Sequence, residues 1–402
     1  MTFLLSLGVR NLRRNLRRTI ISAIAVIAGV AVLILGSGLI DGLDEGVIRG
    51  QIDTQVGHVS LFPPDHPTTG MENPVDGLVA LPDSVAGELE GLTSTPRLRF
   101  DTRAVNGPNG MRVVGVGYEP ETDAEVFSRD GFGLEGQWPE DSGAPGVVIG
   151  TGLAQILEVE IGGFVTLQTR TSMGAQNALS FPVTGVLNAN NPLLDARVVF
   201  LPIDDAQRLV VAPGPSQVAI RLSRRSEALP LAERISGEWQ AVTYLEGAED
   251  MLAINRIRRA ALKVMVIVLM AIAATGIANT VIMSVYERVR EVGTLAAMGM
   301  RPGDIRKLFL LEGAVMGLAA SIVGAIVGGS LNYRLATAGF SIGNLPEAGS
   351  SIPISNIIYT NFSWGPIWLG VLFGITVASV ASVWPARFAA NLDPATAVRD
   401  DG

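Results

Sequence analysis

The pattern of apolar and polar positions divides the chain into two kinds of segment. Four long apolar runs cover residues 19–40, 260–284, 308–331 and 363–386. Each is longer than the roughly 18 residues that indicate a membrane-spanning helix. The first and last runs carry no charged residue, and the other two carry one each, Lys263 and Glu312. The pattern therefore predicts four transmembrane helices.

Residues 41–259, between the first two apolar runs, show short apolar stretches separated by Gly, Pro, Asp and Asn, which is typical of strands joined by turns. Strands are predicted over 111–120, 146–150, 164–170, 179–187, 197–203 and 217–223, and helices over 150–159, 203–210 and 227–239. The predicted fold is a membrane protein with four transmembrane α-helices and a large α+β extracytoplasmic domain inserted between the first and second helix.

Composition supports the assignment as a membrane protein, and the placement of charges predicts its orientation in the membrane. The chain is 48% hydrophobic and 17% charged, which is typical of the membrane class. Five arginines precede the first apolar run without an acidic residue among them, and Asp41, Asp44 and Glu45 follow it. By the positive-inside rule, residues 1–18 form a cytoplasmic amphipathic helix. The run is longer than the apolar core of a signal peptide, so an uncleaved anchor is favoured over a cleaved leader.

The alternation then predicts the side of the membrane for every remaining segment. Residues 41–259 and the short loop 332–362 are expected outside, whereas 285–307 and the tail 387–402 are expected in the cytoplasm, so that both termini are cytoplasmic.

Several kinds of chemistry are excluded by what the sequence lacks. The only lysines, Lys263 and Lys307, do not stand in a Gly-Lys-Ser/Thr motif, so the chain is not itself a P-loop ATPase. Two histidines and no cysteine make a metal centre improbable. The net charge of −8 argues against nucleic acid as a partner. No catalytic, cofactor-binding or metal-binding residue is predicted.

The segment 285–307 places charges between two membrane helices. Glu287, Arg288, Arg290 and Glu291 mark the membrane boundary, and the pattern then predicts a short helix with one apolar face, followed by a turn at Gly299. That face comprises Val292, Leu295, Ala296 and Met298. Such a helix is either a handle on which a cytoplasmic protein exerts force or a simple interfacial anchor.

Small and polar residues within the apolar runs predict helix packing. Gly313 and Gly317, then Gly324 and Gly328, form two small-xxx-small pairs that allow close approach of helix backbones. Asn279 is an amide within an apolar span and needs an interhelical partner. These features indicate packing within a bundle or between two copies, and not an ion path.

Residues 164–187 are predicted to form a β-hairpin with a polar connection over 171–178, containing Ser172, Met173, Gly174 and Gln176. The connection is either an ordinary flexible tip or a loop that contacts a partner.

Two longer motifs carry a family resemblance. "ERVREVGTLAAMGMRPGDIRKLFLLEG" (287–313) and "WPARFAANLDPATAVR" (384–399) resemble the FtsX-like permease module of ABC transporters, with its E-R-x-R-E-[IV]-G-x-L-x-A-x-G and P-A-x-x-A-x-x-x-P-x-x-A-x-R patterns. The N-terminal stretch, "GHVSLF" (57–62) and "GVVIGTGLAQILEVEIGGFVTL" (146–167) are similar to the LolC/LolE branch, the lipoprotein-releasing permeases, and less similar to MacB.

The resemblance implies a non-catalytic permease subunit with the MacB/LolCDE-like, type VII architecture. Its partners would be a cytoplasmic ABC ATPase dimer, which binds ATP and Mg, and a second permease copy, identical or related. Movement of the ATPase would reach the periplasmic domain by mechanotransmission, extract a lipoprotein from the surrounding membrane lipids and release it to a periplasmic chaperone. The implied ATPase-coupling residues are Glu287, Arg288, Arg290, Glu291, Gly293, Leu295 and Gly299.

The same resemblance leaves alternatives open. In LolC-type chains the loop corresponding to 171–178 recruits the chaperone, but here it is short and lacks a clear matching motif. MacB-like efflux of peptides or drugs, and FtsX-like regulation of a cell-wall hydrolase, are the alternative functions.

Overall fold

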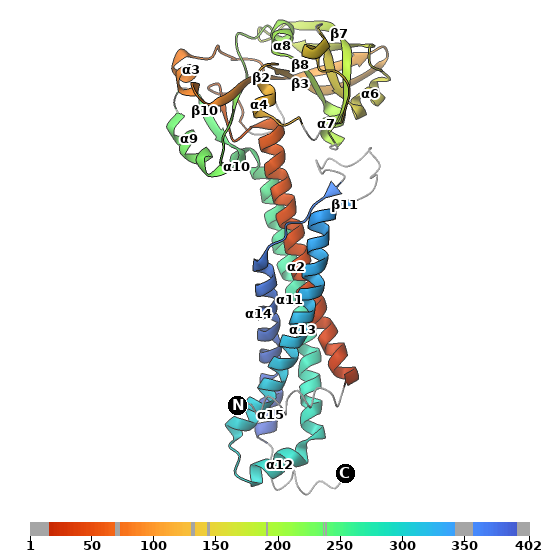
Figure 1. Ribbon diagram of the computed structural model, residues 1–402, viewed down its shortest axis with the longest axis vertical. Helices are drawn as coiled ribbons and strands as arrows, with labels where there is room; N and C mark the ends of the chain where they lie inside the picture. The colour runs from red at the N-terminus through yellow and green to blue at the C-terminus, as the bar shows by residue number, and fades with distance from the viewer. Residues whose placement is uncertain are drawn as a thin grey trace. The chain divides into compact units, whose positions relative to one another are not determined.

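The computed structural model describes residues 16–68, 73–129, 133–142, 145–189, 192–235, 237, 239–341 and 357–391. The chain divides into two compact units, shown in Figure 1. The helical unit comprises 1–44, 254–340 and 359–402, and the α+β unit comprises 45–253 and 341–358. Most of the predicted N-terminal helix over 1–18, and the tail from 392 onward, lie outside the described residues.

Four long helices confirm the four predicted apolar spans. They are α2 (Leu16–Gly50), α11 (Glu249–Glu287), α13 (Pro302–Ala338) and α14 (Trp364–Ala381). All four are long and apolar enough to cross a membrane, the fourth when counted together with α15 (Val383–Ala390), which follows α14. A further short helix, α12 (Val289–Ala297), connects α11 to α13.

Two helices continue well beyond their apolar runs because polar pairs hold their outer ends together. Arg259 on α11 donates hydrogen bonds to Asp41 and Asp44 on α2, at 2.9 and 2.6 Å. Asn255 donates a further hydrogen bond to Asp44 at 2.7 Å. The helical pairing of α2 and α11 therefore extends past the residues that hydropathy assigned to the spans.

The third helix also continues past its predicted end at residue 331, and the fourth is interrupted before its predicted end at residue 386. Asn332, expected in the external loop, lies buried in α13, where its carbonyl oxygen accepts a hydrogen bond from the Thr360 hydroxyl at 2.9 Å. The fourth predicted span, 363–386, is interrupted at Ser382. Pro385 lies three residues later and lacks the N–H that would continue the helical hydrogen-bond ladder, which accounts for the interruption.

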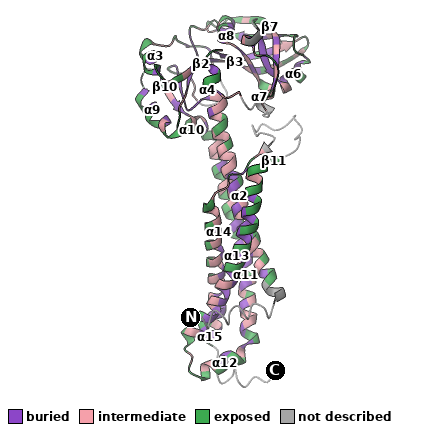
Figure 2. Cartoon of the chain, in the orientation of Figure 1, coloured by how far each residue is buried: buried purple, intermediate pink, exposed green. Residues whose placement is uncertain are grey.

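Glycines on α13 bring its neighbours into close contact. A Cβ at Gly317 would lie 2.3 Å from the Ala378 side chain on α14, and one at Gly328 would lie 2.8 Å from the Ala31 Cα on α2. Gly313 and Gly324 face the same two directions, toward Ser382 and toward Ile27 respectively. The structure therefore places both small-residue pairs inside one bundle, and Figure 2 colours the residues of that bundle by how far each is buried.

The α+β unit confirms the predicted strands and helices and adds several others. Its strands are β1 (Val59–Phe62), β2 (Thr93–Asn106), β3 (Asn109–Tyr118), β4 (Gly133–Gly136), β5 (Val147–Gly150), β6 (Phe164–Arg170), β7 (Gln176–Asn188), β8 (Val198–Pro202), β9 (Gln217–Arg221) and β10 (Gln240–Thr243). Its helices are α3 (Asp83–Leu89), α4 (Asp123–Val126), α5 (Pro139–Ser142), α6 (Thr151–Leu157), α7 (Pro192–Arg197), α8 (Ile203–Val210), α9 (Ala228–Ile235) and α10 (Tyr244–Gly247). Two short strands, β11 (Phe340–Ser341) and β12 (Ile357–Ile358), pair separately.

The sheet has the strand order β10-β1-β9-β2-β3-β8-β5-β7-β4, and β6 bridges β7 back to β2. The strand pairing thus closes on itself through β2, β3, β8, β5, β7 and β6. One hydrophobic core fills this closed part and includes residues of α6 and α8. A second core lies against β1 and β9 and includes residues of α3 and α9.

Strand β2 was missed by the sequence prediction although it is central to the sheet. Its buried positions Leu98, Phe100, Thr102 and Ala104 alternate with charged positions, which is the period of a strand. The charged residues concealed this alternation, and the buried Arg97 is tolerated because Asp123 pairs with it.

The two histidines predict a pH dependence of the α+β unit. Burial lowers the pKa values of both His58 and His66 below the usual value near 6.5. The unprotonated Nδ1 atom of His58 also accepts a hydrogen bond from the Leu222 N–H at 3.2 Å. The histidines therefore contribute stability that is fully present above about pH 6.5 and is lost as the pH falls below it.

We expect the urea midpoint of the full-length protein in detergent, followed through the buried Trp239, to be lower at pH 5.5 than at pH 7.5. His58→Gln, which can still accept a hydrogen bond, should reduce this difference. An unchanged difference in that variant would contradict the role assigned to His58.

Candidate functional site

The connection between α11 and α13 is a sharp corner built around α12. Arg288, at φ −122° and ψ 17°, leaves the helical path between α11 and α12. Gly299 follows α12 at φ +95°, a conformation that favours glycine. Pro302 then begins α13 at a position where its fixed φ is compatible with a helix. The short separate helix predicted between the two spans is present (Figure 1).

Arg288 joins the three helices that meet at this corner. Its side chain is only 9% exposed, and its Nε donates a hydrogen bond to Glu291 on α12 at 2.8 Å. Its Nη1 lies 3.7 Å from Oε2 of the equally buried Glu312 on α13. Glu312 also accepts a hydrogen bond from Ser284 on α11 at 3.0 Å, and the guanidinium lies 5.9 Å from the Phe309 ring centroid. The corner is therefore fixed by charge as well as by packing.

The expected coupling residues fall into two groups. Glu287, Arg290, Glu291 and Gly299 are exposed, and Leu295 is half-buried. Arg288 and Gly293 are buried, so in this conformation they do not offer a surface to a partner. The structure gives Arg288 an internal role, in which it positions α12 through Glu291 and Glu312.

The predicted apolar face of α12 is correct only in part. Val292 is 2% exposed and packs in the bundle core, whereas Met298 is 73% exposed. Met298 follows the last turn of α12 and therefore points away from the face that Val292 occupies. An exposed methionine beside charges of both signs is a surface suited to contact with another protein.

The C-terminal end of α2 meets the sheet at a second fixed connection, which lies within the α+β unit and is called the joint below. Residues Gln51–Gln55 make a π-helical turn, a feature frequent at functional sites. Gln217 on β9 donates a hydrogen bond to the Gln55 carbonyl oxygen at 2.8 Å. Arg221 on the same strand donates a hydrogen bond to Asp53 at 2.9 Å. The sheet thus holds the Gln55 carbonyl group at the end of the turn and the Asp53 carboxylate within it.

Arg97 on β2 holds the same turn from the neighbouring strand. Its Nη1 donates a hydrogen bond to the Thr54 carbonyl oxygen at 2.7 Å. The rest of the guanidinium forms a bidentate pair with Asp123, at 2.6 and 3.0 Å, and lies 3.3 Å from the Phe127 ring centroid. A buried arginine of this kind, with all three guanidinium nitrogens bonded, fixes the π-helical turn against β2.

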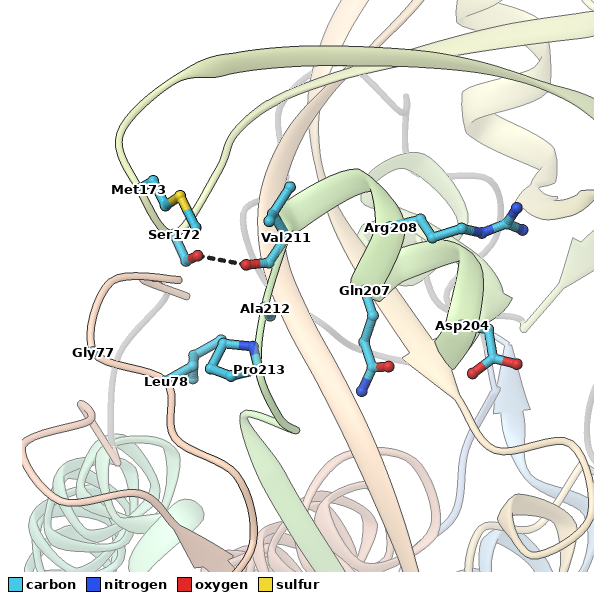
Figure 3. A pocket seen from close by; sticks show the side chains of 10 residues that line it. All are labelled: Gly77, Leu78, Ser172, Met173, Asp204, Gln207, Arg208, Val211, Ala212 and Pro213. Carbon is cyan, nitrogen blue, oxygen red and sulfur yellow. Dashed lines mark hydrogen bonds between the residues drawn. The ribbon is translucent and has the colours of Figure 1, made fainter.

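The tip of the β6–β7 hairpin is anchored to α8. The Ser172 N–H donates a hydrogen bond to the Val210 carbonyl oxygen at 2.9 Å, and its hydroxyl donates one to the Val211 carbonyl oxygen at 2.5 Å (Figure 3). Asn177 donates a third hydrogen bond to the Leu209 carbonyl oxygen at 2.8 Å. These acceptors are the free carbonyl groups at the C-terminal end of α8, so the tip is held in place.

The anchored tip presents one large apolar side chain. Met173 is 83% exposed, and Gly174 provides the left-handed residue of the turn at φ +82°. Gln176 was expected in the connection, but it is the first residue of β7 and stands opposite Arg170 of β6 in the strand register. Beside the tip lies a shallow hollow of about 880 Å³, lined by Met173 and by residues of α8 (Figure 3).

Asn279 does not have the buried setting expected for it. Its side chain lies on an exposed face of α11, and in the described part of the chain it makes no hydrogen bond. It borders a shallow hollow on the surface of the helical unit.

Sequence reasoning missed the contacts that fix the corner around α12 and the π-helical turn. Glu312 is the single charge in its span, and such a charge needs a partner, so a search for an arginine at the same end of the neighbouring span would have found Arg288. The contacts of Arg97 and Gln217 with the π-helical turn bring together residues distant in the chain, and no local pattern indicates them.

Comparison with known proteins identifies relatives over the whole chain. The family profile described as FtsX-like permease C-terminal matches residues 263–394. The profile described as MacB-like periplasmic core domain matches residues 19–237, more than half of the chain.

Individual relatives are similar at low identity. The lipoprotein-releasing system transmembrane protein LolE of Haemophilus influenzae is 24% identical, over 93% of this chain and 92% of its own. LolC of the same system from Xylella fastidiosa is 22% identical over 98% of both chains. The macrolide export ATP-binding/permease protein MacB of Chlorobaculum tepidum is 37% identical, over 31% of this chain and 16% of its own.

Removal of Arg288 should destabilise the corner. Arg288→Met leaves Glu312 buried without its charged partner, which costs about 3 kcal/mol in comparable buried pairs. We expect a lower thermal unfolding temperature of the purified protein in detergent, measured by tryptophan fluorescence. The double variant Arg288→Met/Glu312→Gln should recover part of the loss, because no lone charge remains buried. Equal stability of the single variant and the wild type would contradict the pairing.

Proposed function

Because this chain belongs to the FtsX-like permeases of ABC transporters that carry a MacB-like periplasmic core domain, we propose that it converts ATP-driven movement of a cytoplasmic ATPase into release of lipoproteins from the inner membrane. In this proposal the ATPase binds ATP and Mg, since this chain has no Gly-Lys-Ser/Thr motif. The large domain lies in the periplasm and acts on the substrate.

The observation that carries the proposal is the rigid corner around α12. It displays Glu287, Arg290 and Met298 on an exposed surface between two membrane-length helices. Because Arg288 ties α12 to α13 and to the end of α11, a push on α12 reaches both helices together. Such a corner suits a coupling element and is more than an interfacial anchor requires.

The joint at the π-helical turn completes the proposed path. α2 ends in carbonyl groups held by β2 and β9, so displacement of the helix is passed to the two central strands. These strands contribute to both hydrophobic cores of the domain. In this proposal the displacement changes the whole periplasmic domain and not a single loop.

Lipoprotein release is favoured over efflux by the extent of the similarity. The LolE and LolC relatives match more than nine tenths of this chain, whereas the MacB relative matches 31% of it. MacB-like efflux of peptides or drugs and FtsX-like activation of a cell-wall hydrolase remain the alternatives that experiment has to separate from lipoprotein release.

Loosening the joint should uncouple hydrolysis from release. Gln217→Ala with Arg221→Gln removes two contacts to the π-helical turn, each with a contribution of about 1 kcal/mol, and leaves the pair of Arg97 with Asp123 intact. In proteoliposomes containing the ATPase, we expect the ATPase rate to stay within about twofold while ATP-dependent release falls severalfold.

The control is Arg224→Gln, which breaks an exposed ion pair with Glu227 at 3.0 Å in the same domain. It should change neither rate, because exposed pairs contribute little. If the joint variant released substrate as fast as this control, the turn would have no part in transmission.

The function itself is tested by purification of the tagged protein from native membranes in mild detergent, with mass spectrometry of the proteins and acyl chains that accompany it. Recovery of a P-loop ATPase with acylated lipoproteins is the expected result. Recovery of an adaptor and an outer-membrane duct in place of lipoproteins would support MacB-like efflux. Recovery of a cell-wall hydrolase would support FtsX-like activation. Recovery without any ATPase would overturn the proposal.

A further inference from the structure

Where the apolar run of α11 begins, one exposed face of the helix carries two basic side chains. Arg256, Ala260, Lys263 and Ile267 follow one another at steps of four, three and four residues, so they lie along one face of the helix. All four are exposed. A different face, which includes Val266, packs into the core of the bundle. Arg256 and Lys263 are therefore about two helical turns apart on a surface that faces away from the bundle.

The acidic side chains of α2 at this level are paired with another arginine. Asp41 and Asp44 both accept hydrogen bonds from Arg259, at 2.9 and 2.6 Å. Within the described ranges of the chain, neither Arg256 nor Lys263 makes a hydrogen bond or an ion pair. A charged side chain at the edge of an apolar run is costly without a counter-charge. The two positive charges are therefore available to an anionic group.

Basic residues run against the orientation predicted for this end of the span. The positive-inside rule favours lysine and arginine at cytoplasmic ends, whereas the residues before 260 are expected outside. Arg256, Arg258, Arg259 and Lys263 nevertheless all stand within residues 256–263. Basic residues gathered at a membrane surface attract anionic lipids. A basic cluster in this place therefore points to an anion in the membrane itself.

The neighbouring helices show that this level of α11 is the boundary between hydrocarbon and water. A Cβ at Gly36 of α2 would lie 2.5 Å from the Leu262 Cδ1 atom, and a Cβ at Gly42 would overlap the Tyr359 backbone. Tyr359 and Trp364, which follow one another closely in the chain, are 51% and 66% exposed. Tyrosine and tryptophan gather at the level of the lipid headgroups. The basic cluster thus lies at the depth of the lipid phosphates.

We propose that Arg256 and Lys263 together bind the phosphate of an anionic phospholipid such as phosphatidylglycerol. The side chain of Ala260, between them, is a single methyl group and leaves room for the phosphate. The guanidinium offers a planar fork of donors to the phosphate oxygens, and the flexible lysine stem carries its ammonium to the same level. Val264, 61% exposed, lies one turn beyond Ala260 and contacts the acyl chain. A free phosphate ion would lack this apolar contact, so the lipid is the ligand.

The inference goes beyond the proposed function, because the lipid is a resident ligand and not the transported substrate. α11 is one continuous helix from Glu249 to Glu287, and α12 follows its end. A lipid held at one end of the span therefore fixes the depth at which α12 lies at the other. The test uses the chain without an ATPase, so its outcome is independent of the proposed function.

Quenching by brominated lipids reports which lipid occupies this face. The chain has no cysteine, so Ile267→Cys in the full-length protein carries a single bimane label about one turn from Lys263. The labelled protein is reconstituted into phosphatidylcholine vesicles in which a minor lipid, phosphatidylglycerol or phosphatidylcholine, has brominated chains. The ratio of the two quenching values gives the preference for phosphatidylglycerol at the label.

We expect a preference of roughly twentyfold at low salt, because each basic residue near an anionic lipid contributes about fivefold. The preference should fall as salt is added, since salt screens exposed charges. No preference for phosphatidylglycerol at low salt would overturn the proposal.

Substitution of the two basic residues tests their part in binding. Each of Arg256→Gln and Lys263→Gln should lower the preference about fivefold, and the double variant should bring it close to one. The matched control is Arg103→Gln/Arg112→Gln, which removes two exposed positive charges from opposed positions of β2 and β3. It should keep the preference. An equal loss in the control would mean that net charge decides, which would overturn the proposal.

Two further measurements locate the site and identify its ligand. A bimane label at Leu372→Cys, 63% exposed on α14, should report no preference. Equal preference there would overturn the proposal, because anionic lipid would then gather around the whole protein. Inorganic phosphate, compared with chloride at equal ionic strength, should leave the preference at Ile267→Cys unchanged. Loss of the preference on addition of phosphate would show a site for the free ion and overturn the assignment to a lipid.

Discussion

The contact between Arg288 and Glu312 is the interaction on which the geometry of the helical unit depends. Both side chains are 9% exposed, and a carboxylate or a guanidinium left alone in such surroundings would be strongly destabilising. The two charges therefore hold α12 and α13 at one mutual orientation, and the hydrogen bond from Ser284 adds the end of α11. Because Arg288 is used internally, its charged neighbours Glu287 and Arg290 are left on the outside.

From this corner the helical unit continues through long helices that pack closely against one another. α11 runs without interruption from Glu249 to Glu287, about 58 Å at the rise of an α-helix. Gly317 and Gly328 let α13 lie directly against α14 and α2, so the helices contact each other backbone to backbone. Close-packed surfaces of this kind shift between discrete arrangements and do not deform continuously.

The sequence predicted what depends on local pattern. The four spans, the strands near 111–120 and 164–170, and the short helix after Glu287 all have a period or a composition that can be read directly. β2 was not predicted because the positions that alternate with its core residues carry Arg97, Arg99 and Asp101. Arg97 can be buried because it pairs with Asp123, 26 residues away. Arg288 was expected to contact the ATPase, and its internal role escaped for a similar reason, since its partner Glu312 belongs to another helix. In both cases long-range pairing of charges overrides the local hydropathy.

The π-helical turn at Gln51–Gln55 fixes a rotational phase between residues 45–50, the part of α2 that belongs to the α+β unit, and the strands that follow. A π-helical turn accommodates one more residue than the α-helical turn it replaces, and each residue of an α-helix advances the chain by about 100° around its axis. Removing one residue here would restore a regular α-helix at the cost of turning β1 about residues 45–50 by roughly that angle. Residues Thr54 and Gln55 would then no longer face Arg97 and Gln217. The length of the chain between α2 and β1 is therefore as much a part of this joint as the identity of its side chains.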